Sequence, residues 1–180
     1  MKFSLKSAVI VIIAALVYMV LEDRVGINTA FEHIQITSAY PFLCFMSVVC
    51  GPVSGGMTAF LGTGLVFATE WYLDVPLWIA NVVLCVLVGS FTRDIDIQNG
   101  FFEKVEILRF NLVQALAHLF CWVLLRPGIT SILNRSPFFP LMKDGIWNFL
   151  SNAFSTMLLG TLFLLIYARS RFNASNFYRN

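Results

Sequence analysis

Charged side chains are scarce in this chain, and long apolar stretches separate them. Only 22 of the 180 residues carry a formal charge, 12 as Lys or Arg and 10 as Asp or Glu. In an average soluble protein about a quarter of the residues are charged, and these lie mostly on the surface. Because 58% of the residues here are hydrophobic, the chain is expected to be an all-α integral membrane protein.

The length of the chain limits how many membrane crossings it can make. A transmembrane helix needs roughly 20 mostly apolar residues, so six helices would use about 120 and leave about 60 for loops. That arithmetic excludes a large extramembrane domain or a nucleotide-binding fold, and a net charge of +2 is too small to indicate a nucleic-acid partner. The apolar stretches predict one six-helix transmembrane domain over residues 1–180, with spans at about 5–21, 36–50, 53–69, 76–91, 105–125 and 145–168.

The charges also predict how the helices are oriented. With both termini in the cytoplasm, eight cations and four acids fall inside, and four cations and six acids fall outside. This satisfies the positive-inside rule. The same topology places three loops outside, at 22–35, 70–75 and 126–144, while Gly51 and Pro52 predict a tight helical hairpin between the second and third spans.

Two features that could suggest other chemistry are better explained by burial in the membrane. The four cysteines, Cys44, Cys50, Cys85 and Cys121, lie inside apolar stretches without the close spacing of a metal or redox pair, so we interpret them as small buried side chains. The N-terminal stretch lacks a small-residue cleavage site, and we expect it to remain as the first span.

Polar side chains inside the spans mark a candidate site. In the fifth span, Asn111, Gln114, His118 and Trp122 share one helical face. Other candidates are Asn148 and Asn152 in the sixth span and Trp78 and Asn81 in the fourth. The predicted topology places this group in the outer half of the membrane. Such residues either hydrogen-bond neighbouring helices or surround a small, flat, polar ligand, and for the group as a whole we favour the ligand pocket.

Several other functions are disfavoured by what the sequence lacks. It contains no Walker A motif, no H-E-x-x-H, no G-x-S-x-G and no paired carboxylates within a span. An enzyme, a self-powered pump and an ion-coupled carrier are therefore not expected, and neither a metal nor a cofactor is predicted. Any energy for active transport would have to come from another chain.

Four segments resemble the substrate-binding S components of energy-coupling factor (ECF) transporters. Within that family, they are most similar to the branch associated with pyridoxine or the hydroxymethylpyrimidine precursor of thiamine. The segments are Ala14-Ala15-Leu16; Phe45 to Gly56 around Cys50-Gly51-Pro52; Phe110 to Gln114 followed by Trp122 and Pro127; and Gly145, Asn152 and Leu159 to Leu162, ending in Tyr167-Ala168.

The resemblance implies a six-helix subunit of the bacterial plasma membrane that captures a vitamin at its outer face. It would deliver the vitamin by docking on a transmembrane coupling subunit that carries two cytoplasmic ATPases. The substrate-binding residues would be Trp78, Asn81, Gln114, His118, Trp122, Asn148 and Asn152, with His33 and Gln35 in a lid formed by the first outer loop. Small residues of the first helix, Ser4, Ala8 and Ala15, would contact the coupling subunit.

The sequence also departs from the family pattern. The third span reads Gly62 to Phe67 without the imidazole and carboxylate that are usual there, and His118 stands where Asn is common. These departures bear on which ligand is bound. The alternative is a six-helix membrane scaffold of the cell-shape type with no ligand, in which the polar stripes only hold helices together; an uncoupled channel is a weaker third possibility.

Overall fold

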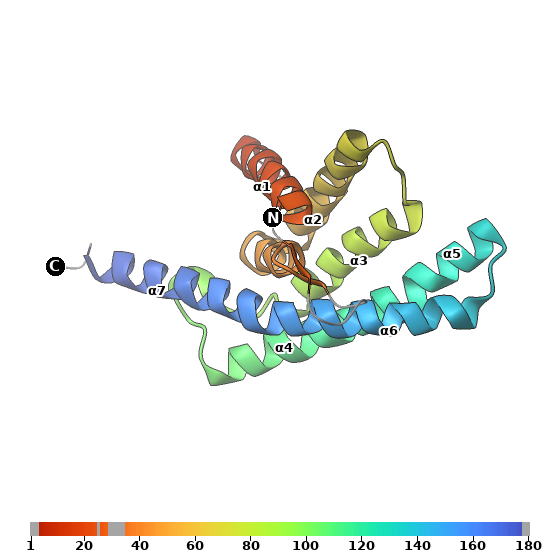
Figure 1. Ribbon diagram of the computed structural model, residues 1–180. Helices are drawn as coiled ribbons and strands as arrows, with labels where there is room; N and C mark the ends of the chain where they lie inside the picture. The colour runs from red at the N-terminus through yellow and green to blue at the C-terminus, as the bar shows by residue number, and fades with distance from the viewer. Residues whose placement is uncertain (1–3, 25, 29–34, 178–180) are drawn as a thin grey trace.

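The computed structural model describes residues 4–24, 26–28 and 35–177, and nearly all of them are helical (Figure 1). The helices are α1 Leu5–Arg24, α2 Ala39–Glu70, α3 Val75–Phe91, the short η1 Ile97–Asn99, α4 Lys104–Leu119, the π-helical η2 Phe120–Leu125, α5 Arg126–Asn134, α6 Phe138–Ser155, the π-helical η3 Thr156–Gly160 and α7 Thr161–Phe177. Strands β1 Gly26–Asn28 and β2 Gln35–Thr37 form a small antiparallel ladder with Ile27 opposite Ile36.

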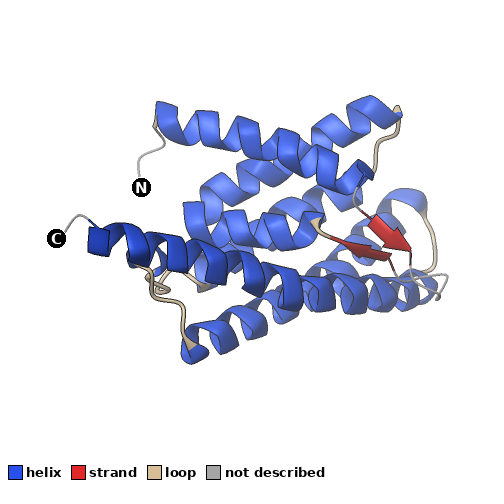
Figure 2. Cartoon of the chain, turned by 60° about the vertical axis from the view of Figure 1, so that its left-hand side comes forward, coloured by secondary structure: helices blue, strands red, loops and turns tan. Residues whose placement is uncertain are grey.

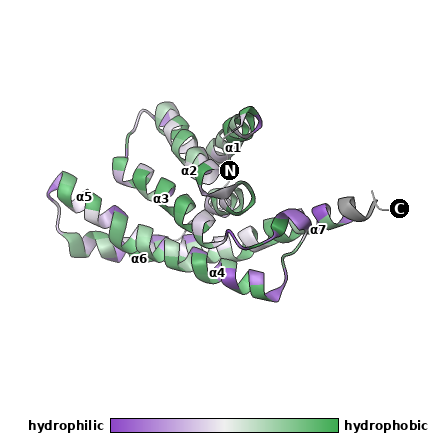
Figure 3. Cartoon of the chain, turned by 180° about the vertical axis from the view of Figure 1, so that it is seen from behind, coloured by the Kyte–Doolittle hydropathy of each residue, from purple (hydrophilic) through white to green (hydrophobic). Residues whose placement is uncertain are grey.

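The helices have the length and composition of membrane-spanning segments. Leu5–Glu22, Lys104–Asn134 and Phe138–Asn173 are long and apolar enough to cross a bilayer, and Ala39–Cys50 and Val75–Phe91 are shorter apolar helices. In Figure 3 the helical ribbons are largely green, the colour of hydrophobic residues, as expected for helices whose surroundings are lipid. The prediction of an all-α, multi-pass membrane protein is confirmed.

Helix α2 bends sharply at Gly51, whose φ of 86° and ψ of 169° lie outside the helical region. Glycine adopts such a positive φ without strain, and Pro52 has no N–H with which to continue the helix. A Cβ on Gly55 would lie 2.8 Å from Cα of Ser47, although residues eight apart in a straight helix are separated by about 12 Å. The stretches expected at 36–50 and 53–69 are therefore two helical segments joined by a tight turn at Gly51 and Pro52, as predicted, and they are in contact beside it.

The connections between helices gather at two opposite ends of the bundle. At one end Gln98, from η1, donates from Nε2 to the carbonyl of Val49 beside the bend at 2.8 Å, and the Tyr167 hydroxyl of α7 donates to Oε1 of Gln98 at 2.9 Å. Ser7 of α1 borders the same region, and Figure 2 shows α1 beginning and α7 ending on one side. Both described ends of the chain therefore lie at one end of the bundle, as an even number of crossings requires.

The segment 126–144, expected as an outer loop, is largely helical. Helix α5 continues directly from η2, and only residues 135–137 separate it from α6. Pro127 directly follows this π segment inside the continuous helix, and it has no N–H with which to bond the preceding turn. The stretch Lys104–Asn134 has 31 residues and so measures about 46 Å, which exceeds the thickness of a hydrocarbon core of about 30 Å.

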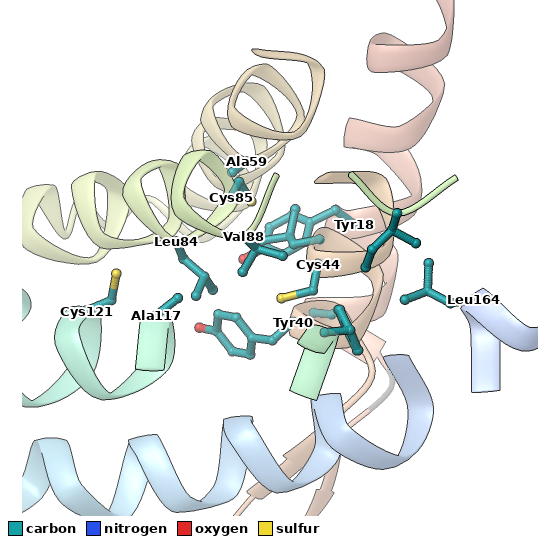
Figure 4. Close-up of a cluster of buried hydrophobic side chains, with 14 of the residues drawn as sticks. Tyr18, Tyr40, Cys44, Ala59, Leu84, Cys85, Val88, Ala117, Cys121 and Leu164 are labelled. Carbon is teal, nitrogen blue, oxygen red and sulfur yellow. The ribbon is translucent and has the colours of Figure 1, made fainter. Parts of the chain in front are cut away.

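The core lies where α2, α3, α4 and η2 meet. Figure 4 shows Cys44, Cys85 and Cys121 among apolar side chains that include Leu84 and Val88. All three thiols are buried and free, which agrees with their interpretation as small apolar side chains; Cys50, beside the bend in α2, is free and partly buried. Among the described residues, no group of three or more His, Cys, Asp or Glu side chains is arranged to hold a metal ion.

Candidate functional site

A cavity of about 580 Å³ lies at the end of the bundle opposite the chain ends. The start of α3 forms one wall, η2 and α5 form the next, and α6 completes it with Gly145 and Asn148. Its volume falls within the range of about 300–1,000 Å³ that is typical of small-molecule sites. In the predicted orientation this cavity faces the outside of the cell.

An ion pair crosses the mouth of the cavity. Nη2 of Arg126 lies 2.8 Å from Oδ2 of Asp74, and both residues line the cavity. The other carboxylate oxygen of Asp74 accepts the backbone N–H of Leu77 at 2.8 Å and so caps α3. The pair fastens α3 to α5 and holds a charged donor and a charged acceptor where a ligand would enter.

Trp122 lies at the floor of this cavity, but only 1% of its surface is exposed, because neighbouring side chains cover its ring. The Arg126 guanidinium lies over its ring at 5.4 Å from the centroid, a favourable cation–π arrangement. From the side, Tyr40 meets the indole edge-on, with the ring centroids 5.3 Å apart. An aromatic floor beneath a cationic rim suits a flat heteroaromatic ligand with polar substituents.

Below the floor, Trp122, His118 and Thr156 form a hydrogen-bonded chain. The indole N–H of Trp122 donates to Nδ1 of His118 at 2.9 Å, and Nε2 of His118 lies 3.2 Å from the Thr156 hydroxyl. An indole N–H can only donate, so Nδ1 must accept, and the imidazole proton belongs on Nε2, from which it donates to Thr156. The chain links η2 to η3 and fixes the orientation of the floor.

The absence of a side chain at Gly145 allows α6 to lie close to η2. A Cβ on Gly145 would overlap with the carbonyl oxygen of Trp122 and would lie 3.3 Å from Cγ of Pro127. Glycine is therefore the only residue that fits here without a shift of α6. π segments such as η2 occur frequently at functional sites.

Gln114 and Asn152 lie deeper than the cavity and do not line it. Gln114 is buried and donates from Nε2 to the carbonyl of Ala153 at 3.2 Å, while its Oε1 has no partner among the described residues. Asn152 is also buried. Asn111, farther along the same face of α4, donates to the Thr161 hydroxyl at 3.1 Å. The polar stripe of α4 thus faces α6, η3 and α7.

Trp78 and Asn81 belong to a different contact, between α3 and the second half of α2. The Trp78 indole stacks on Phe60, with centroids 4.9 Å apart, and donates to the Phe60 carbonyl at 2.8 Å. Asn81 donates to Tyr18 of α1 and Thr63 of α2. The structure therefore does not bring Trp78 beside Trp122, and the expectation that the two indoles face one ligand does not fit this arrangement.

The remaining expected lid and site residues are placed as follows. Asn148 lines the cavity and donates to the carbonyl of Asp144 at 3.1 Å. Gln35 is in β2, opposite Asn28 in the ladder, and β2 contacts α6. His33 lies outside the described residues.

The three residues expected to contact a coupling subunit do not form one free surface. Ser4 is exposed and accepts the backbone N–H of Ser7 at 3.2 Å, and Ala8 is half-buried. Ala15 is only 1% exposed, and Gly62 of α2 packs against its carbonyl. The small residues at 14 and 15 therefore let α2 approach α1, and the free face of α1 is made of larger apolar side chains, including Ile12, Ile13 and Leu16.

Sequence reasoning missed Asp74 and Arg126, which line the cavity, and Tyr40, which packs edge-on against Trp122. In the sequence, Asp74 and Arg126 are counted only among the charges on the outer side of the predicted spans. The feature that could have identified this pair is their opposite charge on two segments that are expected on the same side of the membrane. Tyr40 had a weaker signal, as a phenol at the start of an apolar stretch.

Comparisons with known proteins agree with the earlier resemblance. The family model described as "ECF-type riboflavin transporter, S component" matches residues 2–169. The chain is 29% identical to a UPF0397 protein of Enterococcus faecalis, over 94% of this chain and 93% of that protein. It is also 28% identical to a UPF0397 protein of Lactobacillus johnsonii, over 93% and 91% of the two chains. A UPF0397 protein of Staphylococcus aureus is 27% identical, over 93% and 92%. No solved structure matches the chain.

Proposed function

Since the chain belongs to the family of ECF-type riboflavin transporter S components, we propose that it captures a flat heteroaromatic vitamin or vitamin precursor in the cavity above Trp122. The family is one of membrane-bound substrate-binding subunits of transporters rather than of enzymes. The observation that carries the proposal is the cavity itself, in which an aromatic floor lies beneath the ion pair of Asp74 and Arg126.

The chemistry of the cavity supports a neutral ligand with hydroxyl groups. Asp74 accepts hydrogen bonds, Arg126 donates them, and Asn148 can do both. Their charges are already paired, so the cavity does not require a charged ligand to balance it. A heteroaromatic ring that takes the place of the Arg126 guanidinium over the Trp122 indole, with hydroxyl groups directed toward Asp74 and Asn148, would use these groups.

Three compounds fit this description. The segments that resemble the pyridoxine and hydroxymethylpyrimidine branch favour one of those two, whereas the description of the matching family model names riboflavin. All three carry a flat ring with hydroxyl substituents, and a cavity of about 580 Å³ has room for any of them. Our preferred ligand is pyridoxine or hydroxymethylpyrimidine.

Delivery into the cell would require partner chains. We propose that the loaded subunit docks on a transmembrane coupling subunit with two cytoplasmic ATPases, and that the end of the bundle carrying Ser7, Gln98 and Tyr167 faces the cytoplasm. The alternative of a ligand-free membrane scaffold is disfavoured, because the match to a transporter family covers residues 2–169.

A thermal-shift screen with purified protein tests the proposal. The panel contains pyridoxine, hydroxymethylpyrimidine, riboflavin and thiamine, with no ATP present. Ligand at about 100 times its Kd should stabilise the folded chain by about 2.7 kcal/mol, because only the folded state binds it. We expect a clear rise in Tm with one of these compounds. A separate sample with ATP alone serves as the control and should show no rise. The absence of a rise in Tm with any vitamin would refute the proposed function.

A further inference from the structure

A second, wholly apolar groove lies on the surface of the bundle between α3 and the α4–η2 helix. Its volume is about 350 Å³, and it is lined by Leu87, Phe91, Val113, Leu116, Ala117 and Phe120. Ala117 is 4% exposed, whereas Leu116 and Phe91 are 57% and 61% exposed. The groove therefore has a low floor at Ala117 between higher side-chain walls, and it is open toward the bilayer.

A cationic side chain lies at one end of this groove. Arg109 is one helical turn before Val113 on α4, and its Nε donates to the carbonyl of Phe91 at 3.2 Å. Its Nη2 lies 2.8 Å from Oδ2 of Asp94, whose side chain is 76% exposed. These contacts with described residues use two of the five N–H groups of the guanidinium, and such an exposed ion pair is weak. Arg109 can therefore also bind a phosphate.

The shape of the groove favours a flexible chain over a partner helix. Transmembrane helices pack closely where small residues let their backbones approach. Here Ala117 is the only small residue in the lining, and large side chains such as Leu87, Phe91 and Phe120 surround it. A rigid helix would rest on these walls and leave the floor empty, whereas an acyl chain can bend to fill it.

We propose that this groove binds one phospholipid, with an acyl chain along the α3–α4 groove and its phosphate at Arg109. Arg109 belongs to the same end of the bundle as the loop between α3 and α4, so the lipid would come from the leaflet on the side of the chain ends. The site lies apart from the vitamin cavity, with which it shares no lining residue.

Native mass spectrometry of delipidated protein with added phosphatidylglycerol tests this proposal. We expect the unmodified chain to bind one molecule of the added phosphatidylglycerol. Arg109→Gln should lower its occupancy by about fivefold, the size expected for one cation at an anionic lipid surface, and Val113→Trp should lower it at least as much by filling the groove. Matched controls on α4 are Lys104→Gln, another exposed cation, and Leu112→Trp, an exposed residue outside the groove.

Diacylglycerol, which lacks the phosphate, separates the two parts of the site. Its binding should fall with Val113→Trp but not with Arg109→Gln. Equal phosphatidylglycerol occupancy in all variants would overturn the proposal. The proposal would also be overturned if the Val113→Trp variant kept its lipid but lost a co-purifying membrane subunit, because the groove would then bind a helix of a partner protein. The Tm of each variant shows whether it is folded.

Discussion

Replacing Gly145 with alanine is expected to destabilise the protein and to abolish ligand binding. The new Cβ would overlap with the backbone carbonyl oxygen of Trp122, and a backbone atom cannot move aside as the end of a flexible side chain can. Overpacking of this kind costs about 1–3 kcal/mol or more. Because α6 and η2 are two walls of the cavity, the shift that relieves the overlap would also change its shape. Thermal unfolding and vitamin binding measure the two effects.

Gly128→Ala is the matched control. Gly128 is also helical and lies only two turns from the cavity floor along η2 and α5, but a Cβ there would have no atom within 4 Å. Since alanine favours a helix over glycine by up to about 1 kcal/mol, this variant should be as stable as the unmodified chain or slightly more stable. If Gly145→Ala has the same Tm as Gly128→Ala, the close approach of α6 to η2 is not real.

Trp122→Ala is expected to weaken vitamin binding by about a hundredfold. Loss of a stacking surface costs about 1–3 kcal/mol per ring, and the substitution also removes the surface over which Arg126 lies. The Trp122 indole is moreover the donor that fixes the orientation of His118. Equilibrium binding to purified protein measures the change, and the amount of protein recovered from membranes shows that insertion is preserved.

Trp122→Phe separates the loss of binding from a general loss of stability. A buried Trp→Ala change costs about 3–5 kcal/mol, so the alanine variant alone could bind poorly because it is partly unfolded. Phenylalanine keeps a ring on the cavity floor but removes the N–H that bonds to His118. We expect Trp122→Phe to bind within about tenfold of the unmodified chain. Unchanged affinity in Trp122→Ala would show that the ligand lies elsewhere.

The membrane fold could be predicted from the sequence because it follows from where charges are absent. Apolar stretches must become helices in lipid, where backbone groups need internal partners, and α1 begins at Leu5 as expected. Helical periodicity also placed Gln114, His118 and Trp122 on one face, and the structure joins His118 to Trp122 by a hydrogen bond one turn apart.

The parts that could not be predicted depend on contacts between helices. The series Arg126, Pro127 and Gly128 is typical of a helix end, but α5 continues directly from η2. Periodicity gives the face of a helix but not the neighbour that the face meets. For this reason Trp78, which faces Phe60 of α2, could not be distinguished from a cavity residue.

The central claim, that the cavity above Trp122 binds a vitamin without help from ATP, is tested most directly by equilibrium dialysis in nanodiscs. The labelled vitamin is the one identified by the thermal-shift screen. Thr130→Trp blocks the cavity, which Thr130 lines. Ile132→Trp on the same helix is the control, because Ile132 is 80% exposed and does not line the cavity. Our account predicts one saturable site per chain, with an affinity lowered by about tenfold or more in Thr130→Trp and unchanged in Ile132→Trp. The absence of saturable binding, or equal affinity in Thr130→Trp and the unmodified chain, would contradict it.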